Sequence, residues 1–464
     1  MPKVKTYPLY LIFLFAFALR LAFAFWFQRY INGEIIFTNN DTTSFTNAFL
    51  NLYQYGVYTF DPTHPDASFF RPPVYPFFWG AHYILFGEAH VFEAIAVSQS
   101  LIDAASAILI YLIASKLGVR PIFALIGGIL HAVNPFQLIW VPITGTEIVA
   151  TFVSLLIVFF ILTSQLSARR LFWLGLLIGS AVLLRQYLGI FIVIAAAWIA
   201  ISTQFHPYKA IRPMAYLVLG FCMILSPWVL RNWVNFGSPY ILMGETRGYY
   251  NYGPDAVAFE NMFNKFDENI TSYFYDAARH GEVDLENFEL DPGIKASLQE
   301  AVALAHRCGP SFLEARGDRS FVFEDRDKEC EAKIIDAFER ARLAYRANVG
   351  LFRYHATRLD ALSKAFFKST LTSKEIGNSY IDIAVKISFY IRTFVIISAF
   401  LSILILCRTS FITISFPLFM YFYIPVITIH TEIRYLIQAD AILLALFALT
   451  FDQLWRRLEL RYQE

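Results

Sequence analysis

The chain has 464 residues, of which 57% are hydrophobic, 17% are aromatic and only 16% are charged. Soluble globular chains carry about a quarter of charged residues, so this composition excludes an ordinary soluble domain. The formal net charge of +1 gives no support for a nucleic-acid-binding protein, because such proteins carry a basic patch or stripe. The composition, with a mean hydropathy of +0.49, predicts an all-α integral membrane protein.

The apolar segments of the chain come close to the length that a helix needs to cross a bilayer, which is about 20 residues. Ten of them are expected in chain order, at Tyr7–Gln28, Phe92–Leu117, Pro121–Trp140, Glu147–Leu166, Leu171–Leu184, Leu188–Thr203, Met214–Leu230, Ile383–Cys407, Phe411–Ile429 and Ile433–Phe451. The first segment is too long for the apolar region of a signal peptide and lacks a small-residue cleavage site. We therefore expect it to be retained as a membrane helix.

Positive residues favour one side of this arrangement. Cytoplasmic loops of membrane proteins are enriched in Lys and Arg, and alternate connections here contain Lys3 and Lys5, Lys116 and Arg120, Arg169 and Arg170, Lys209 and Arg212, Arg408, and Arg456, Arg457 and Arg461. The pattern predicts a multi-pass protein of the plasma or inner membrane with both termini in the cytoplasm. The fifth and sixth segments are short and could form one broken helix, but two crossings keep the alternation.

The other connections define the expected domains. Residues 1–231 form an N-terminal transmembrane module with a long first outer loop at 29–90, residues 232–382 a mostly helical extracytoplasmic subdomain, and residues 383–464 the C-terminal transmembrane helices. Near the end of the subdomain, apolar residues at helical spacing mark an amphipathic helix, namely Ile335, Phe338, Tyr345, Val349, Phe352, Leu359, Leu362 and Phe366. This helix either lies along the membrane surface or packs into the subdomain with its arginines in solvent.

Of the four cysteines, Cys222 and Cys407 lie in or beside apolar runs, whereas Cys308 and Cys330 lie in the expected outer segment. An oxidising compartment permits a disulfide there, and we predict a Cys308–Cys330 bond. Closing a loop of about 20 residues contributes about 3 kcal/mol to stability. The sequence contains no Cys/His cluster with the spacing of a zinc site.

Four arginines are expected at the outer ends of helices or in outer connections, at Arg71, Arg185, Arg231 and Arg434. A charge placed within hydrocarbon costs a few kcal/mol, so each needs a partner. Because arginine binds phosphate and carboxylate through planar, bidentate contacts, a shared lipid phosphate would explain all four. The alternative is a set of internal ion pairs, for example between Arg434 and Glu432.

Two acids accompany these arginines on the expected outer side, Asp41 after the first helix and Glu147 at the start of the fourth. A carboxylate near the membrane boundary can act as a general base toward a hydroxyl. Both positions also suit an acid that stabilises the N-terminus of a helix. The sequence leaves both roles open, and for Asp41 the surrounding residues favour catalysis.

These residues lie within a longer pattern. It comprises Asp41…Phe45…Ala48…Leu52…Gly56…Tyr58, Arg71-Pro72-Pro73…Tyr75-Pro76, Thr146-Glu147, Leu184-Arg185, Pro227-Trp228…Arg231-Asn232…Phe236-Gly237 and Arg434-Tyr435. It resembles that of GT-C glycosyltransferases, the polyprenyl-phosphate-sugar-dependent enzymes related to protein O-mannosyltransferases and lipid A aminoarabinose transferases. Two departures leave the subfamily open, because Thr42 replaces a second acid and Gln438-Ala439 replaces an expected proline. Residues 250–332 match no pattern that we recognise.

The resemblance implies a GT-C fold and transfer of a sugar from a polyprenyl-phosphate donor to a hydroxyl of a glycan, lipid or protein on the extracytoplasmic face, with inversion. It implies that Asp41 is the general base with Glu147 beside it, and that Arg71, Arg185, Arg231 and Arg434 bind the donor phosphate. Tyr75, Tyr187 and Tyr435 would line the substrate site. No cofactor is required, a divalent metal is not indicated because a single Asp is a poor metal site, and the partners are lipids and glycans and not nucleic acid.

Two other functions compete with this interpretation. A lipid-linked polysaccharide polymerase or ligase would also depend on arginines but would not need the loop that carries Asp41. A transporter would have polar residues or broken helices near the middle of the membrane and two related halves, whereas the polar residues here lie at the ends of the expected helices.

Overall fold

The structure is a computed structural model that describes residues 6–39, 41–60, 71–236, 254–263, 280–286, 290–307, 327–367, 379–402, 410–423 and 433–462. Over these residues it contains helices and no strand, as the composition predicts. The membrane part comprises α1 (Thr6–Ala22), η1 (Phe23–Phe27), α2 (Gln28–Asn32), α3 (Thr42–Tyr55), α4 (Val74–Phe86), α5 (Val91–Lys116), α6 (Pro121–Ala132), α7 (Pro135–Leu138), α8 (Glu147–Thr163), α9 (Ala168–Val182), η3 (Gln186–Gly189), α10 (Ile190–Ser202), α11 (Pro207–Phe236), α18 (Ser379–Leu401), α19 (Ser410–Phe422), η7 (Ile433–Tyr435) and α20 (Ile437–Arg461).

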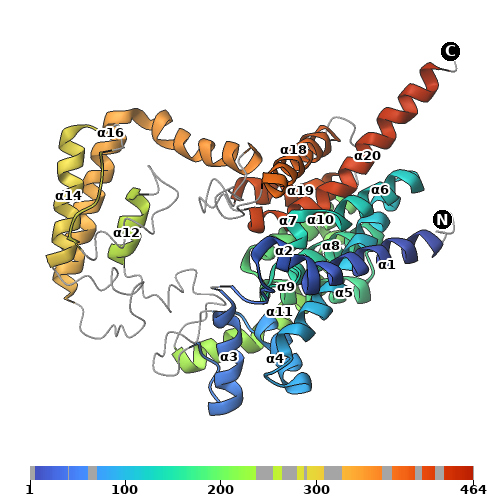
Figure 1. The fold of residues 1–464 in the computed structure, drawn as a ribbon, viewed down its shortest axis with the longest axis horizontal. Helices are drawn as coiled ribbons and strands as arrows, with labels where there is room; N and C mark the ends of the chain where they lie inside the picture. The colour runs from blue at the N-terminus through green and yellow to red at the C-terminus, as the bar shows by residue number, and fades with distance from the viewer. Residues whose placement is uncertain are drawn as a thin grey trace.

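The centre of the bundle is α20, in which every residue from Ile437 to Thr450 is buried. It contacts α5, α6, α8, α18 and α19, and α1 packs on α5 and α6. An apolar helix that is buried all round belongs in the interior of a large helical protein. The start of α1 and the end of α20 lie on the same side of the bundle, while α3 lies toward the other (Figure 1).

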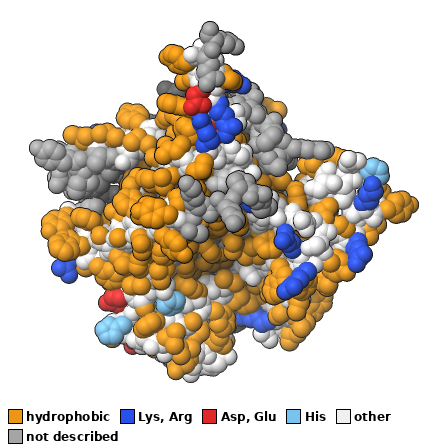
Figure 2. All heavy atoms as spheres, turned by 90° about the vertical axis from the view of Figure 1, so that its right-hand side faces the viewer, with side chains coloured by type: hydrophobic (Ala, Val, Ile, Leu, Met, Phe, Trp, Pro, Cys, Tyr) orange, Lys and Arg blue, Asp and Glu red, His pale blue; other side chains and the backbone are white. Residues whose placement is uncertain are grey.

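Each of the ten expected spans overlaps a helix within its described residues, but only four helices in the described part are long and apolar enough to cross a membrane by length and composition. They are Tyr7–Tyr30, Val91–Lys116, Pro207–Asn235 and Ile437–Arg461. Shorter apolar helices occur at Pro121–Ala132, Glu147–Thr163, Gln186–Ser202 and Ile412–Phe422. The chain is thus a membrane protein, and ten crossings stay a prediction. On the side where α1 begins, the apolar surface is interrupted mainly by Lys and Arg (Figure 2).

The expected span 121–140 is not one continuous helix, because it is broken between α6 and α7. Proline forces the residue before it out of the helical region, and Asn134 accordingly has φ −67° and ψ 111°. The Asn134 side chain accepts a hydrogen bond from the Phe136 N–H at 3.1 Å, which caps α7. In contrast, α11 is longer than expected and runs through both Pro213 and Pro227.

A buried ionic cluster that we did not single out in the sequence stabilises this break. The Arg20 guanidinium of α1 pairs with Asp103 of α5 at 2.5 Å and donates to the carbonyl oxygens of His131 and Ala132 at 3.3 and 3.0 Å. These carbonyls lie at the C-terminal end of α6 and lack helical partners. Asp103 also accepts from the amide of Gln137 of α7 at 2.8 Å. The cluster therefore fixes both sides of the break.

Close contact between α9 and α11 depends on glycine. A Cβ built on Gly175 would lie 2.1 Å from the Leu217 carbonyl oxygen, and one on Gly220 would lie 2.1 Å from that of Phe172. Small residues let helix backbones approach closely in membranes, where packing rather than hydrophobic transfer drives association. These glycines therefore set the distance between the two helices.

We expect Gly175→Ala to lower the free energy of unfolding by about 1–3 kcal/mol, because the added methyl group meets a backbone atom that cannot move aside. Thermal unfolding of the purified protein in detergent would measure the change. Gly189→Ala is the matched control, since its Cβ would come no closer than 3.4 Å to Val182. Equal melting temperatures for the two variants would contradict this account of the packing.

The expected outer subdomain contains α12 (Pro254–Phe263), α14 (Pro292–Arg307) and α16 (Lys328–Phe367), which lie to one side of the bundle (Figure 1). Its core is formed by Phe259, Phe263, Leu298, Phe338 and Tyr345 together with smaller apolar residues. Phe338 and Tyr345 therefore pack into the subdomain, which is one of the two alternatives for this helix, and do not lie along a membrane surface. The side chains of Phe352, Leu359, Leu362 and Phe366 lie outside the described residues.

Within α16 the helix changes direction at Gly350, which has φ 77° and ψ 157°. Cys330, near the start of this helix, is disulfide-bonded. Its predicted partner Cys308 lies outside the described residues, as does Cys407, and Cys222 is a free, exposed thiol on α11.

Candidate active site

A cavity of about 310 Å³ lies at the end of the bundle where α9 ends and α8 begins. It is formed by the segment before α3, the residues after α7, the turn between α9 and η3, and η7. Its lining comprises Asn39, Asp41, Phe45, Arg71, Pro72, Gly145, Thr146, Glu147, Leu184, Arg185, Gln186, Tyr187, Tyr423, Arg434 and Tyr435. Five of the six predicted charged residues therefore meet in one cavity, although they come from separate parts of the chain.

Asp41 stands at the N-terminus of α3, but its carboxylate does not cap that helix. The side-chain oxygen of Asn39 takes this role, accepting from the N–H groups of Asp41 and Thr42 at 3.0 and 3.1 Å. The Asp41 carboxylate instead accepts a hydrogen bond from Arg434 at 2.9 Å and lies 3.7 Å from Arg71. Its side chain is 46% exposed, so it is open to a ligand.

Arg71 reaches the cavity from the segment before α4. Its guanidinium lies 4.3 Å from the centre of the Phe45 ring and donates to the Ser44 hydroxyl at 2.8 Å, both on the first turn of α3. Burial lowers the pKa of Arg71, and the nearby Asp41 carboxylate opposes this effect. The ring and the hydroxyl fix the direction of the guanidinium while leaving an edge toward Asp41.

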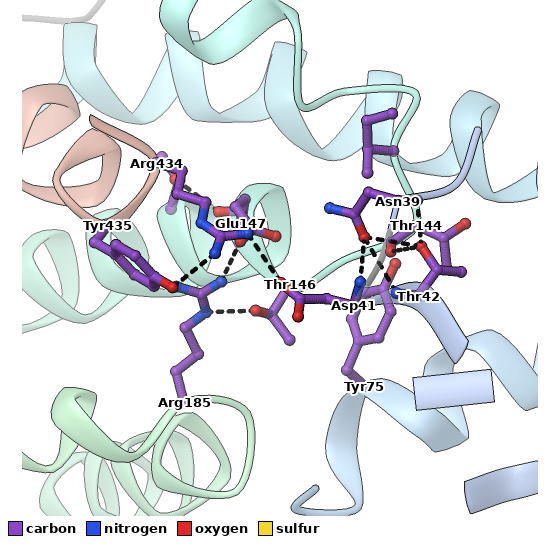
Figure 3. A network of polar contacts seen from close by, with 12 residues as sticks. Asn39, Asp41, Thr42, Tyr75, Thr144, Thr146, Glu147, Arg185, Arg434 and Tyr435 are labelled. Atoms are coloured by element: carbon purple, nitrogen blue, oxygen red, sulfur yellow. Dashed lines mark hydrogen bonds and ion pairs between the residues drawn. The ribbon is translucent and has the colours of Figure 1, made fainter. Parts of the chain in front are cut away.

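Arg185 lies on the opposite wall of the cavity and is tied to the start of α8. It forms an ion pair with Glu147, donates to the hydroxyl of Thr146 and donates to the hydroxyl of Tyr187 at 2.9 Å (Figure 3). Burial alone would lower the pKa of Arg185, but Glu147 and Tyr187 raise it above its usual value. The Glu147 side chain is only 8% exposed, and its carboxylate accepts a hydrogen bond from the Arg185 guanidinium.

Arg434 stands in η7, directly before the central helix α20. It donates to Asp41 as described and to the Tyr435 hydroxyl at 2.8 Å, and it lies 5.8 Å from the Trp140 ring centre. The Tyr435 ring centre also lies 5.8 Å from the Arg185 guanidinium, so this ring contacts both cations (Figure 3). Tyr187 and Tyr435 are therefore in the positions expected for cavity-lining residues.

Two predicted site residues do not line the cavity. Arg231 donates to the backbone carbonyl of Tyr58 at 2.8 Å and stacks on Trp228 at 4.6 Å. The Tyr58 hydroxyl in turn donates to the Arg71 carbonyl oxygen at 2.9 Å. Arg231 is therefore connected to the Arg71 backbone through Tyr58. Tyr75 is 1% exposed and its hydroxyl donates to Gln99 at 3.1 Å, because helix α4 turns this ring into the protein.

The cavity is suited to an anion beside a reacting hydroxyl. Three guanidinium groups and two carboxylates line it, which leaves a formal charge of +1, and Glu147 neutralises Arg185 from the buried side. Among the described residues no group of three His, Cys, Asp or Glu side chains could hold a metal ion. That no cofactor is required and that no metal is indicated both stay predictions.

The fold and the cavity define a polytopic helical membrane protein with an arginine-rich site at one end of its bundle. Residues 70–230 match the family described as dolichyl-phosphate-mannose-protein mannosyltransferase. This match confirms the resemblance to GT-C glycosyltransferases inferred from the sequence, and it supports a membrane glycosyltransferase of the GT-C type. It includes Arg71, Glu147 and Arg185 but neither Asp41 nor Arg434.

Other comparisons add less. The oligosaccharyltransferase of Archaeoglobus fulgidus, solved in the apo form, is similar to this chain at 12% identity and a TM-score of 0.36. The similarity covers 84% of this chain and 56% of that one, so the chain spans little more than half of its length. At this TM-score the likeness adds nothing to the family match. No curated protein matches the chain.

Proposed function

We propose that the protein transfers a sugar from a polyprenyl-phosphate donor to a hydroxyl group, with Asp41 as general base and Arg71, Arg185 and Arg434 binding the donor phosphate. The observation that carries this proposal is the contact of Asp41 with Arg434, at 2.9 Å, on the wall of an arginine-lined cavity. A base must lie within hydrogen-bond reach of the acceptor, and the acceptor must lie beside the bond to the phosphate.

In the proposed reaction, the acceptor oxygen forms a bond to the anomeric carbon of the sugar while the bond from that carbon to the phosphate oxygen breaks. The electron pair leaves with the phosphate, and the arginines stabilise the charge that develops there. Asp41 accepts the proton of the acceptor hydroxyl and then loses it to solvent through its exposed side. Attack occurs from the face opposite the phosphate, so the configuration of the sugar is inverted.

The contact between Arg434 and Asp41 suggests how donor and base are coupled. Arg434 now pairs with Asp41, and a donor phosphate would compete for the same guanidinium. When the phosphate takes this contact, the carboxylate becomes available to the acceptor hydroxyl. Glu147 differs, because it is buried against Arg185. We therefore assign Glu147 to positioning Arg185 and not to proton transfer.

We further propose that this end of the bundle faces the extracytoplasmic side of the plasma or inner membrane, as the distribution of Lys and Arg indicates. A polyprenyl donor then reaches the cavity from the outer leaflet. The acceptor, which the proposal leaves as a glycan, lipid or protein hydroxyl, would approach from the water side. Cytoplasmic termini follow from the same assignment, since α1 starts and α20 ends on the other side (Figure 1).

Labelling of cysteine in intact cells would test the sidedness. In a Cys222→Ala background, we expect Lys333→Cys to react with a membrane-impermeant maleimide, because Lys333 is exposed on α16. An Arg457→Cys variant, at the exposed end of α20, should react only after permeabilisation. The reverse pattern would place the cavity in the cytoplasm and would remove the case for a lipid-linked donor on the outer face.

The function itself is tested by transfer of a radiolabelled sugar from synthetic polyprenyl-phosphate sugars to membrane extracts, using the purified protein in proteoliposomes. We expect release of polyprenyl phosphate together with a labelled product. If the labelled donor crosses the bilayer unchanged, the protein is a transporter. If an oligosaccharide chain on a polyprenyl-diphosphate carrier is transferred in place of a single sugar, the protein is a polymerase or ligase.

A further inference from the structure

The segment that carries Thr146 and Glu147 has an unusual course. After α7 ends at Leu138, the chain runs through turns to the start of α8 at Glu147. Val141 and Thr144 are completely buried, and Thr146 is 2% exposed. Irregular backbone that is buried requires internal partners for its polar groups, because water cannot reach them. The partners of this segment therefore decide where Thr146 and Glu147 stand.

One side chain supplies several of these partners. Gln99 of α5 is completely buried, and its amide N–H₂ donates to the carbonyl oxygens of Val141 and Ile143 at 2.8 and 2.9 Å. Its oxygen accepts from the Tyr75 hydroxyl at 3.1 Å. All three groups are buried or nearly so, which makes these bonds costly to lose.

Tyr75 completes the connection to the cavity. Burial raises the pKa of Tyr75 well above its usual value, and the nearby Gly145 backbone N–H opposes this effect. The hydroxyl therefore stays protonated and donates to Gln99, which orients the Gln99 amide toward the two carbonyls. Gly145 is the residue that joins this network to Thr146 and Glu147, and Figure 3 shows Tyr75 close to this segment.

Helix α5 supports both ends of the connection between α6 and α8. Asp103 lies one helical turn from Gln99, so both project from the same face. Asp103 holds Gln137 of α7 at 2.8 Å, and Gln99 holds Val141 and Ile143. The neighbouring Ser100 differs, because its hydroxyl bonds only to the Ala96 carbonyl of its own helix, at 2.7 Å.

We propose that Gln99, oriented by Tyr75, is a positioning residue that holds the 141–146 backbone and thereby aligns Thr146 and Glu147 with Arg185. The expected effect on activity rests on the proposed function, whereas the role of Gln99 in holding residues 141–146 does not. Arg185 takes its direction from three oxygen atoms, two of which belong to Thr146 and Glu147. A shift of this segment would misplace the guanidinium relative to the donor phosphate.

The first test measures kinetics in Gln99→Met, which keeps the size of the side chain but removes its hydrogen bonds. We expect kcat/KM to fall roughly 10- to 100-fold, since misplacing a reacting group by about 1 Å costs up to this much. Ser100→Ala is the control on the same helix and should retain wild-type kinetics. If Gln99→Met does not fold, Tyr75→Phe removes only the hydroxyl that orients Gln99 and should give a smaller loss in the same direction.

A double-mutant cycle separates positioning from a general loss of stability. In an Arg185→Lys background, Gln99→Met should cause little further loss, because both changes remove the same alignment. Independent, multiplicative losses would overturn the proposal, as would wild-type kinetics in both Gln99→Met and Tyr75→Phe.

A second readout does not depend on the reaction. Hydrogen exchange of peptides spanning residues 139–147 should be faster in Gln99→Met than in wild type or Ser100→Ala. Unchanged exchange would refute the positioning role even if transfer were impaired. If exchange is faster in Gln99→Met but the wild-type protein transfers no sugar, the positioning role is retained and the proposed function is refuted.

Discussion

Asp41→Asn is expected to reduce kcat by on the order of 10²–10⁴, because the amide cannot accept the acceptor proton. Donor binding should not weaken. The Asp41 carboxylate forms an ion pair with Arg434 at 2.9 Å and lies 3.7 Å from Arg71. Replacing this carboxylate by a neutral amide therefore leaves both guanidinium groups available to an anionic donor. We therefore expect equal or tighter binding of the donor together with the loss of turnover, which isothermal titration and initial rates would measure separately.

Glu88→Gln is a matched control for this experiment, since Glu88 is an exposed acid in the connection between α4 and α5, outside the cavity. It should leave both donor binding and kcat unchanged. A catalytic loss in Asp41→Asn that comes entirely from weaker donor binding would contradict the assignment of Asp41 as the base. In that case the carboxylate would act only through the arginines.

Arg434→Gln is expected to lower kcat/KM by about 10²–10³, with both a higher KM for the donor and a lower kcat. Its charge acts on the bound phosphate and again on the charge that develops as the phosphate leaves. Arg434 is a better residue for this test than Arg185, because its substitution is expected to disturb stability less. Truncating Arg185 would leave the buried Glu147 carboxylate without its ion-pair partner and would cost several kcal/mol of stability.

Asp41 tolerates the loss of Arg434 better, because it is 46% exposed and keeps Arg71 nearby. The control is Arg457→Gln, because Arg457 is exposed near the end of α20, whereas the cavity residues Arg434 and Tyr435 precede its start. A rise in KM with unchanged kcat would mean that Arg434 contributes only to ground-state binding. An unchanged kcat/KM would remove Arg434 from the site.

The membrane helices and the cavity could be predicted because they follow from simple patterns. Long apolar runs locate helices, and charged residues at the ends of those runs need partners, which brought Asp41, Arg71, Arg185 and Arg434 into one prediction. Arg231 was misplaced by the same argument. Its partners are the Tyr58 backbone and the face of Trp228, and the sequence does not show that such local contacts can satisfy a guanidinium.

The positioning residues could not be recognised in the same way. Gln99 and Asp103 stand inside an apolar helix, where a polar residue was a visible signal, but nothing in the sequence gives their partners. The break at Asn134-Pro135 was equally visible, since proline disfavours a continuing helix. Its support by Arg20 depends on the packing of α1 against α6, which only the structure supplies.

Gly350 gives α16 a mechanical property. A Cβ at this position would meet nothing within 4 Å, so space does not require glycine there, but φ 77° with ψ 157° is open almost only to glycine. The part of α16 beyond it is an arm of about 25 Å that leads from the subdomain core toward α19. A change of about 10° at this pivot moves the far end of such an arm by about 4 Å. The backbone torsions of this one residue thus set the angle between the two parts of α16.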